Sequence, residues 1–304
     1  AYDINSLKVG KDLSEAIFAE PNNTMKFCDV PKTGVTVQPG VINDGVGKFV
    51  KDIITTSPDS ENFEDSLRES GAEILINLLP VGSDEAVKYY AQAAINSNVG
   101  FINCIPVFIA RDEEWYQKFK DASVPLIGDD IKSQVGATIV HRALAQLFSD
   151  RGVKLENTYQ LNVGGNMDFL NMLEEDRLET KRTSKTSSVT SVANKGKGMD
   201  PKNVRIGPSD YVEWLEDRKK AFIRLEGESF GGVPLNIEVQ LEVWDSPNSA
   251  GVVIDAVRYM KFFKDSGDLE SLDLVSAWLM KAPAKAAKDS DTLQKLHELT
   301  HQED

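Results

Sequence analysis

The sequence has 304 residues, of which 41% are hydrophobic and 27% are charged, and its net charge is −14 at pH 7. This composition is typical of a globular protein, and the length is enough for roughly two domains. The acidic balance argues against sequence-independent binding of nucleic acid, whose phosphates need a basic face. A small anionic substrate stays open, because a local lysine cluster can override the overall sign.

The two cysteines, Cys28 and Cys104, are far apart and give no disulfide framework, so a reducing cytoplasm is expected. The sequence shows no signal peptide. It also has no apolar stretch near the roughly 20 residues that a membrane helix needs. We therefore expect neither a membrane nor a nucleic acid among the partners.

From residue 73 the sequence alternates apolar runs with helical patterns. Buried strands are predicted at 73–80, 99–106 and 124–128, with helices at 83–98 and 112–122 between them. This spacing indicates βαβ units and a parallel sheet, whose strands are apolar on both faces.

The second half of the chain has a different character. A helix after residue 134 is predicted to bury an apolar stripe. The stripe consists of Ile139, Val140, Leu144, Leu147 and Phe148. Further on we expect a strand at 158–163, a helix at 169–185, an antiparallel ribbon of 221–226 with 234–244, and a helix at 248–264. The Ser-, Thr- and Lys-rich stretch 182–200 predicts a mobile loop or linker, and the polar tail 289–304 is expected to fray.

The first candidate site motif is Asn162–Asp168, directly after a strand. Its paired glycines would let the backbone approach a ligand closely, and Asn166 and Asp168 would lie at the mouth of the next helix. A tight strand-to-helix turn with an Asp cap is the alternative, and it is the better one for this motif alone.

The second candidate is Lys181 with Lys185, whose spacing of four places both ammonium groups on one helical face. A solvated face is the alternative. The nearby Ser184, Ser187 and Ser188 favour a phosphate site, because hydroxyls and ammonium groups supply the donors that a phosphate needs.

The third candidate is the pair Asp129 and Asp130, just after a predicted strand, where open α/β sheets bind ligands. An N-capping turn is the alternative for this pair, as it is for Asp245 at another strand end. Taken singly, Lys219 and Lys281 would be assigned to surface charge.

Two other kinds of site are missing from the sequence. The three histidines do not cluster with cysteines, which argues against a histidine zinc site and a Ser-His-Asp triad. The chain has no Gly-x-Gly-x-x-Gly motif, although Asp3 fits the acidic residue that binds ribose about 20 positions after such a motif. We therefore expect the glycine loop to precede residue 1.

In combination and in this order, these motifs resemble inositol-1-phosphate synthases of the actinobacterial and archaeal type, over nearly the whole chain. The most specific segments are Leu79–Ser83, Gly128–Gly136, Asn162–Met172, Ser184–Thr186 and Trp244–Gly251.

The resemblance implies an α/β fold in three parts. The first is a Rossmann-type parallel-sheet domain at 1–132 that lacks its first strand and glycine loop. The second is an α+β catalytic domain at 133–244 that also builds a homotetramer, and the third is a return to the first domain at 245–304.

The resemblance also implies the site residues. The catalytic positions are Lys181, Lys185, Lys219, Lys281, Asp130, Asp168 and Asp245. The NAD-contacting positions are Asp3, Asp12, Ser70, Tyr90, Ser133, Asp168 and Lys181. A divalent or monovalent metal ion would bind at Asp245.

The implied reaction is the NAD-dependent isomerisation of glucose 6-phosphate to inositol 1-phosphate, without net redox change. Two alternatives stay open. One is an NAD-dependent polyol dehydrogenase, and the other is a catalytically silent oligomeric fragment.

Overall fold

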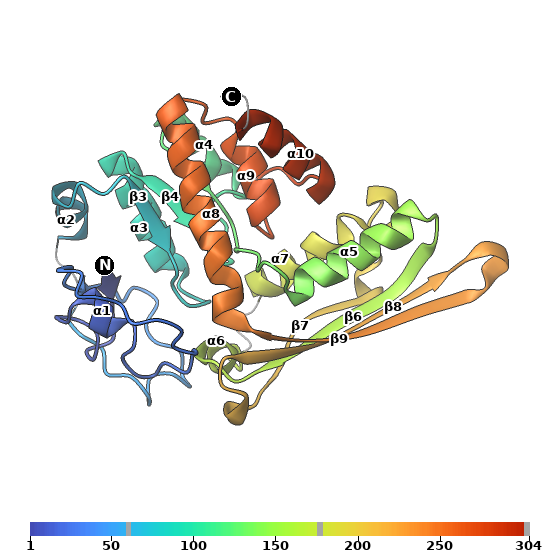
Figure 1. Cartoon of the computed structure of the whole chain (residues 1–304), viewed down its shortest axis with the longest axis horizontal. Helices are drawn as coiled ribbons and strands as arrows, with labels where there is room; N and C mark the ends of the chain where they lie inside the picture. Colours follow the sequence, from blue (N-terminus) through green and yellow to red (C-terminus); the bar gives the residue numbers. More distant parts are fainter. Residues whose placement is uncertain (59–61, 175–178, 301–304) are drawn as a thin grey trace.

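The computed structural model describes residues 1–58, 62–174 and 179–300, and within 179–184 it describes the backbone alone. In these residues the chain forms three sheets, with strand orders β1-β2, β3-β4-β5 and β7-β6-β8-β9 (Figure 1). Within the described ranges, each helix is too short or too polar to span a lipid bilayer.

The three-stranded sheet is parallel, as the alternating pattern predicts. It consists of β3 (Ile74–Asn77), β4 (Gly100–Asn103) and β5 (Leu126–Ile127). The helix α3 (Asp84–Ser97) connects β3 to β4, and α4 (Glu113–Asp121) connects β4 to β5. These elements confirm the strands and helices predicted between residues 73 and 128.

Helices cover this sheet on both faces, so its central strand is fully buried. In β4, Phe101 packs in one cluster with residues of α3, and Ile102 packs in another with residues of α8 (Asp245–Ser266). Both side chains are 0% exposed. The long helix α8 thus returns the chain to the three-stranded parallel sheet, which it crosses in Figure 1.

The N-terminal segment attaches to α3 through aromatic rings. It contains β1 (Tyr2–Asp3), α1 (Leu13–Ala16), β2 (Gln38–Pro39) and α2 (Phe63–Glu69), and β1 pairs with β2 in parallel. The ring of Phe63 packs edge-on against those of Tyr2 and Tyr90, with both centroid distances at 4.6 Å. Edge-to-face pairs at this distance are favourable.

The four-stranded sheet contains the longest strands. They are β6 (Lys154–Gly164), β7 (Val204–Tyr211), β8 (Arg218–Glu228) and β9 (Pro234–Trp244). The strands β8 and β9 form the predicted antiparallel ribbon. Between them lies η5 (Phe230–Gly232), where Gly231 and Gly232 have positive φ angles of 76° and 77°, which glycine adopts without a steric cost.

One face of this sheet is covered by α5 (Ala137–Asp150) and α7 (Glu179–Thr190) (Figure 1). The predicted apolar stripe of α5 was wrong in part, because Leu147 is 48% exposed while His141 is 0% exposed. The buried face carries His141 and Arg142 because polar partners on β6 and α7 bind them there.

Two further predictions were wrong. The expected helix at 169–185 is replaced by α6 (Met167–Asn171) and α7. The stretch 182–200 is no linker, because its middle belongs to α7 and then to η2 (Ala193–Gly196). Val189 and Ala193 are 0% exposed in a cluster with Ala145 of α5, and this packing orders the stretch.

The short helices η3 (Pro201–Asn203) and η4 (Glu213–Leu215) precede and follow β7. The C-terminal part contains α9 (Leu272–Leu279) and α10 (Asp289–Thr300). The tail predicted to fray is helical up to Thr300, because Leu296 is 0% exposed in the core beneath α8 and α9.

Candidate active site

One half of the candidate site lies at the carboxyl edge of the parallel sheet, directly after β5. Asp130 has a φ of 63°, a left-handed conformation that non-glycine residues rarely adopt. Its N–H donates to the Ile105 carbonyl (3.1 Å), and its carbonyl accepts from the Lys281 N–H (2.7 Å). These bonds hold the unusual backbone in place.

The same contact joins the side chains of Asp130 and Lys281. Lys281 Nζ donates to Asp130 Oδ1 at 2.7 Å, and the side chains are only 14% and 5% exposed, respectively. Lys281 reaches Asp130 because Ile131 and Met280 form a β-bridge beside them. A buried ion pair of this kind holds a cation at a ligand-binding edge.

Asp129 has a different role from its neighbour. It is 0% exposed and accepts hydrogen bonds from the N–H groups of Ile109, Ala110 and Arg111, and from the Asn103 side chain. Burial raises its pKa to about 7, and these donors oppose that rise. Asp129 therefore anchors the loop after β4, and neither carboxylate caps a helix.

The other half of the site lies at one end of the four-stranded sheet. Lys219 of β8 donates to Asp245 Oδ1 at 2.9 Å, with 16% and 18% of the side chains exposed. Asp245 is the first residue of α8 and directly follows β9, where Trp244 pairs with Arg218. The register of the β8–β9 ribbon thus fixes the Lys219–Asp245 pair.

Two further residues position this pair: Asp217, which the prediction left out of the site, and Asn166 of the first candidate motif. Asp217 is 0% exposed and accepts from Asn166 Nδ2 (3.0 Å) and from both the backbone N–H (3.1 Å) and the hydroxyl (2.8 Å) of Ser246. Asn166 also donates to the other oxygen of Asp245 at 3.5 Å. Since Asp217 is followed by three basic residues, its sequence context indicates only surface charge.

Electrostatics links the two halves. Burial alone would lower the pKa of Lys219, but the carboxylates of Asp245, Asp168 and Asp130 act together to raise it. Asp168 lies in α6, next to the end of the four-stranded sheet, and Asp130 follows β5 of the parallel three-stranded sheet. The ends of these two sheets therefore meet at Lys219. Lys219 is therefore a stable cation, suited to hold an oxyanion rather than to carry protons.

The neighbouring thiol is not a nucleophile. Burial raises the pKa of Cys104 to about 12, and the negative charge of Asp130 adds to that shift. A thiol in this state stays protonated at neutral pH, so covalent thiolate chemistry is excluded at Cys104.

The paired glycines of the first motif serve packing within the chain. A Cβ on Gly164 would lie 2.5 Å from the Phe169 ring, and one on Gly165 would lie 2.5 Å from the Val212 carbonyl oxygen. Real Cβ atoms do not approach so closely, so the glycines admit chain neighbours rather than a ligand. The following turn carries a cap, but Asn166 supplies it by accepting from the Phe169 N–H, whereas the alternative predicted an Asp cap.

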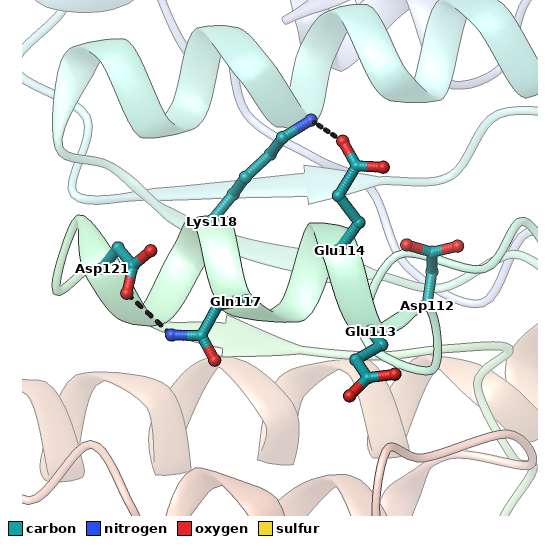
Figure 2. Close-up of a pocket in the computed structure, with 6 residues that line it drawn as sticks. All are labelled: Asp112, Glu113, Glu114, Gln117, Lys118 and Asp121. Carbon is teal, nitrogen blue, oxygen red and sulfur yellow. Dashed lines mark hydrogen bonds and ion pairs between the residues drawn. The ribbon is translucent and has the colours of Figure 1, made fainter.

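A hollow of about 610 Å³ along α4 has the wrong charge for an anionic substrate. Its lining comes from one helix and the residue before it, and two of its carboxylates, Glu114 and Asp121, bind neighbours on that helix (Figure 2). The lining residues are Asp112, Glu113, Glu114, Gln117, Lys118 and Asp121. Four carboxylates beside one lysine would repel a phosphate.

Comparison with known proteins places this arrangement in a family. Residues 136–246 match the profile of myo-inositol-1-phosphate synthase. The inositol-3-phosphate synthase of Mycolicibacterium smegmatis is 59% identical over 294 residues, which is 95% of this chain and 80% of the relative. The enzyme of the same name from Mycobacterium tuberculosis is 56% identical over 98% of this chain and 81% of its own length.

The chain belongs to the myo-inositol-1-phosphate synthase family.

The fold agrees with this assignment. A myo-inositol-1-phosphate synthase-related protein from Thermotoga maritima superposes with a TM-score of 0.77 at 24% identity, covering 98% of this chain and 85% of that one. The Rossmann-like parallel sheet with a second domain, expected from the sequence, is therefore confirmed.

Two of the lysines that the sequence prediction assigns to the site belong to α7. Lys185 is 4% exposed, so it is no solvated surface lysine. The side chain of Lys181 lies outside the described residues, although its backbone belongs to α7. The structure thus brings together Lys219, Asp245, Asp168, Asp130 and Lys281, and it leaves the side-chain position of Lys181 undescribed.

The positions expected to contact NAD have contacts of their own. Asp3 ends β1 and pairs with Lys8 (3.0 Å), Asp12 caps α1, and the Tyr90 hydroxyl accepts from the Val41 N–H (2.9 Å). The Ser70 hydroxyl donates to the Leu67 carbonyl, and Ser133 lies in the loop before α5, whose neighbours Gln134 and Val135 bond to Asn248. None of these five positions has a described contact with Lys219, in contrast to Asp168, whose charge acts on it.

A metal ion does not fit the residues around Asp245. Among the described residues, no group of three His, Cys, Asp or Glu side chains is arranged as metal ligands. One oxygen of Asp245 is taken by the Lys219 ammonium group. We therefore derive no step through a metal ion.

Proposed function

We propose that this chain isomerises D-glucose 6-phosphate to 1L-myo-inositol 1-phosphate with NAD as cofactor. The observation that carries the proposal is the meeting of two buried lysine–carboxylate pairs, Lys219–Asp245 and Lys281–Asp130, at the ends of both sheets. Its context is a family whose relatives are named inositol-3-phosphate synthase.

The chemistry requires cations beside developing oxyanions. When bound, NAD supplies a hydride exchange at C5 that is reversed later, so the substrate and product have the same oxidation state. The ketone at C5 acidifies the C6 protons, and the carbanion equivalent at C6 then attacks the C1 aldehyde and closes the ring. Both the enolate at C5 and the alkoxide at C1 are stabilised by fixed positive charge.

The lysines divide these tasks. We assign Lys181 to the C5 oxygen, and Lys185, Lys219 and Lys281 to the phosphate and the C1 oxygen. The raised pKa of Lys219 supports its role as a permanent cation. Asp245 and Asp130 hold their lysines at fixed positions, so little reorganisation is needed when charge develops.

For the cofactor, Asp3 is the residue that best fits ribose recognition. It ends a parallel strand, and its side chain is 31% exposed, with Oδ2 paired to Lys8 and Oδ1 accepting from the Asn5 N–H at 2.8 Å. The proposal includes the adenosine-side position Asp12 and the further NAD-contacting positions Ser70, Tyr90, Ser133, Asp168 and Lys181.

The proposal also includes a cytoplasmic homotetramer. On the sheet face that α5 and α7 leave open, Leu161 and Phe222 pair across β6 and β8 and are 36% and 37% exposed. An apolar pair on an open sheet face supports association with a second sheet.

The test incubates the purified chain with NAD⁺ and glucose 6-phosphate. Inositol phosphate is followed by phosphorus NMR, and NADH by its absorbance. We expect product without net NADH. NADH formed in proportion to substrate would instead indicate a polyol dehydrogenase. The absence of both inositol phosphate and NADH would reject the proposal for this chain.

A further inference from the structure

A second, basic pocket lies on the α7 side of Lys281. Its volume is about 260 Å³, and it is enclosed by α5, α7 and the segment between α9 and α10. The polar side chains that line it are Arg111, Lys132, Arg142, Ser187, Ser188, Ser191 and Lys281. Neither Lys219 nor Asp245 lines this pocket, so it is separate from that half of the active site.

The pocket has more positive than negative charge. Four cationic side chains line it, and the ion pairs described for them involve two carboxylates, Asp289 and Asp130. Asp289 is shared between Lys132 and Arg142, whose side chains are only 4% and 7% exposed. Burial lowers the pKa of Lys132 to about 8, and the charges of Arg142 and Lys281 contribute to the shift. An anion in the pocket would offset this excess.

A buried hydroxyl in the pocket wall has no partner. Ser188 is 4% exposed, and its Oγ makes no hydrogen bond among the described residues. A buried hydroxyl without a partner costs free energy, so such groups in native proteins usually have an external partner. Ser188 is thus a donor available to a ligand.

Further donors surround this hydroxyl. Arg142 Nη1 donates to the Ser188 carbonyl and the Ser191 hydroxyl, and its Nη2 donates to the Ala287 carbonyl. Among the described residues, the Ala287 carbonyl is the one acceptor for Nη2, which has two N–H bonds, so one N–H bond of Nη2 is left for a ligand. At the mouth of the pocket, Arg111 donates to the Ser187 hydroxyl at 3.0 Å.

We propose that this pocket binds a phosphate-class oxyanion, either inorganic phosphate or a small phosphate monoester. Arginine and serine donors around a tetrahedral anion are the usual means of phosphate recognition. The volume of about 260 Å³ accommodates a phosphate with a small organic group. The anion would tie α7, which carries Lys185, to α5 and Lys281.

The test is calorimetric titration of inorganic phosphate into the full chain at low ionic strength. Ser188→Ala removes the unpartnered hydroxyl and no hydrogen bond of the free protein, and Arg111→Gln removes a cation at the pocket mouth. We expect the double variant to bind phosphate about ten-fold more weakly. The control Arg258→Gln removes a 78% exposed arginine of α8 and should leave the affinity unchanged.

A further variant locates the anion. If Lys219→Ala abolished phosphate binding while Ser188→Ala/Arg111→Gln did not alter it, the anion would lie in the active site and the proposal would be wrong. Equal affinity in all variants would also reject it. Because this readout is binding, it stands whether or not inositol phosphate is formed.

A second titration distinguishes the two sources of the anion. Glycerol 3-phosphate that binds more tightly than inorganic phosphate, with the same loss in the double variant, assigns the pocket to an ester. Weaker binding of the ester assigns it to free phosphate.

Discussion

Lys219 and Lys220 are adjacent in β8 and point to opposite faces of the sheet, so they form a matched pair for testing the site. Lys219 is buried against Asp245, whereas Lys220 is 43% exposed and pairs with Glu242 on the open face. We expect Lys219→Ala to lower kcat by at least about 100-fold, the scale of losing one oxyanion-stabilising group. Lys220→Ala should keep near-normal kcat.

The melting temperature of both variants checks that the fold is retained. Lys219→Ala with near-normal turnover and an unchanged melting temperature would mean that Lys219 does not stabilise the transition state.

Asp217 is the residue whose loss should affect stability more than its sequence context suggests. In Asp217→Asn, an amide NH₂ faces the donors of Asn166 or Ser246. We therefore expect the free energy of unfolding to fall by about 2 kcal/mol. Urea denaturation measures the change, and Asp52→Asn, at an exposed position, is the control. A loss no larger than that of the control would contradict the anchoring role of Asp217.

At the scale of elements, the contact of α5 with β6 predicts a pH dependence. His141 lies between Thr158 (2.6 Å) and Gln160 (3.2 Å), and burial lowers its pKa to about 4. As pH falls from 6.5 towards 4, the unfolded chain takes up a proton that folded His141 does not, so the folded state loses stability. The loss reaches about 3 kcal/mol near pH 4.

The measurement compares the free energies of unfolding of the wild type and His141→Gln at pH 7 and pH 4. The comparison is needed because Asp129, whose pKa is raised to about 7, gains stability over the same range and remains in both proteins. If the difference in free energy of unfolding between the wild type and His141→Gln were the same at both pH values, a neutral buried His141 would be ruled out.

The elements differ in how far the sequence predicts them. The strands and helices between residues 73 and 128 follow from local periodicity, because parallel strands are apolar on both faces. The helix α7 does not, because Ser and Thr are poor helix formers. The burial of Val189 against α5 decides the outcome.

The site shows the same division. Asp130 and Asp245 are predictable as polar residues at strand ends. Their pairing with Lys281 and Lys219 depends on contacts across 151 and 26 residues of sequence, which no local pattern contains. The family resemblance supplied those lysines, whereas Asp217 and Asn166 became visible as positioning residues only in the folded chain.

At the scale of the whole molecule, the open face of the four-stranded sheet predicts self-association. Phe222→Asp places a charge beside Leu161 on that face, so we expect the particle mass from light scattering to fall below that of a tetramer. Phe27→Asp, at a position that is 70% exposed in the first part of the chain, should leave the mass unchanged. A Phe222→Asp protein that kept the wild-type mass would place the interface elsewhere.

The division of the chain at residues 132 and 244 stays a prediction. The helix α8 begins at Asp245 beside Lys219 and packs against the parallel sheet along its length, so the third segment contacts both of the others.

This path of the chain also sets an order of events during synthesis. When the ribosome has made β8, Lys219 is present without Asp245, and Lys281 is made more than 60 residues after it. A growing chain therefore lacks the assembled cation cluster until α8 and α9 have emerged and packed. The proposed isomerisation would therefore begin only in molecules whose synthesis has passed Lys281, and not in the incomplete chains on the ribosome.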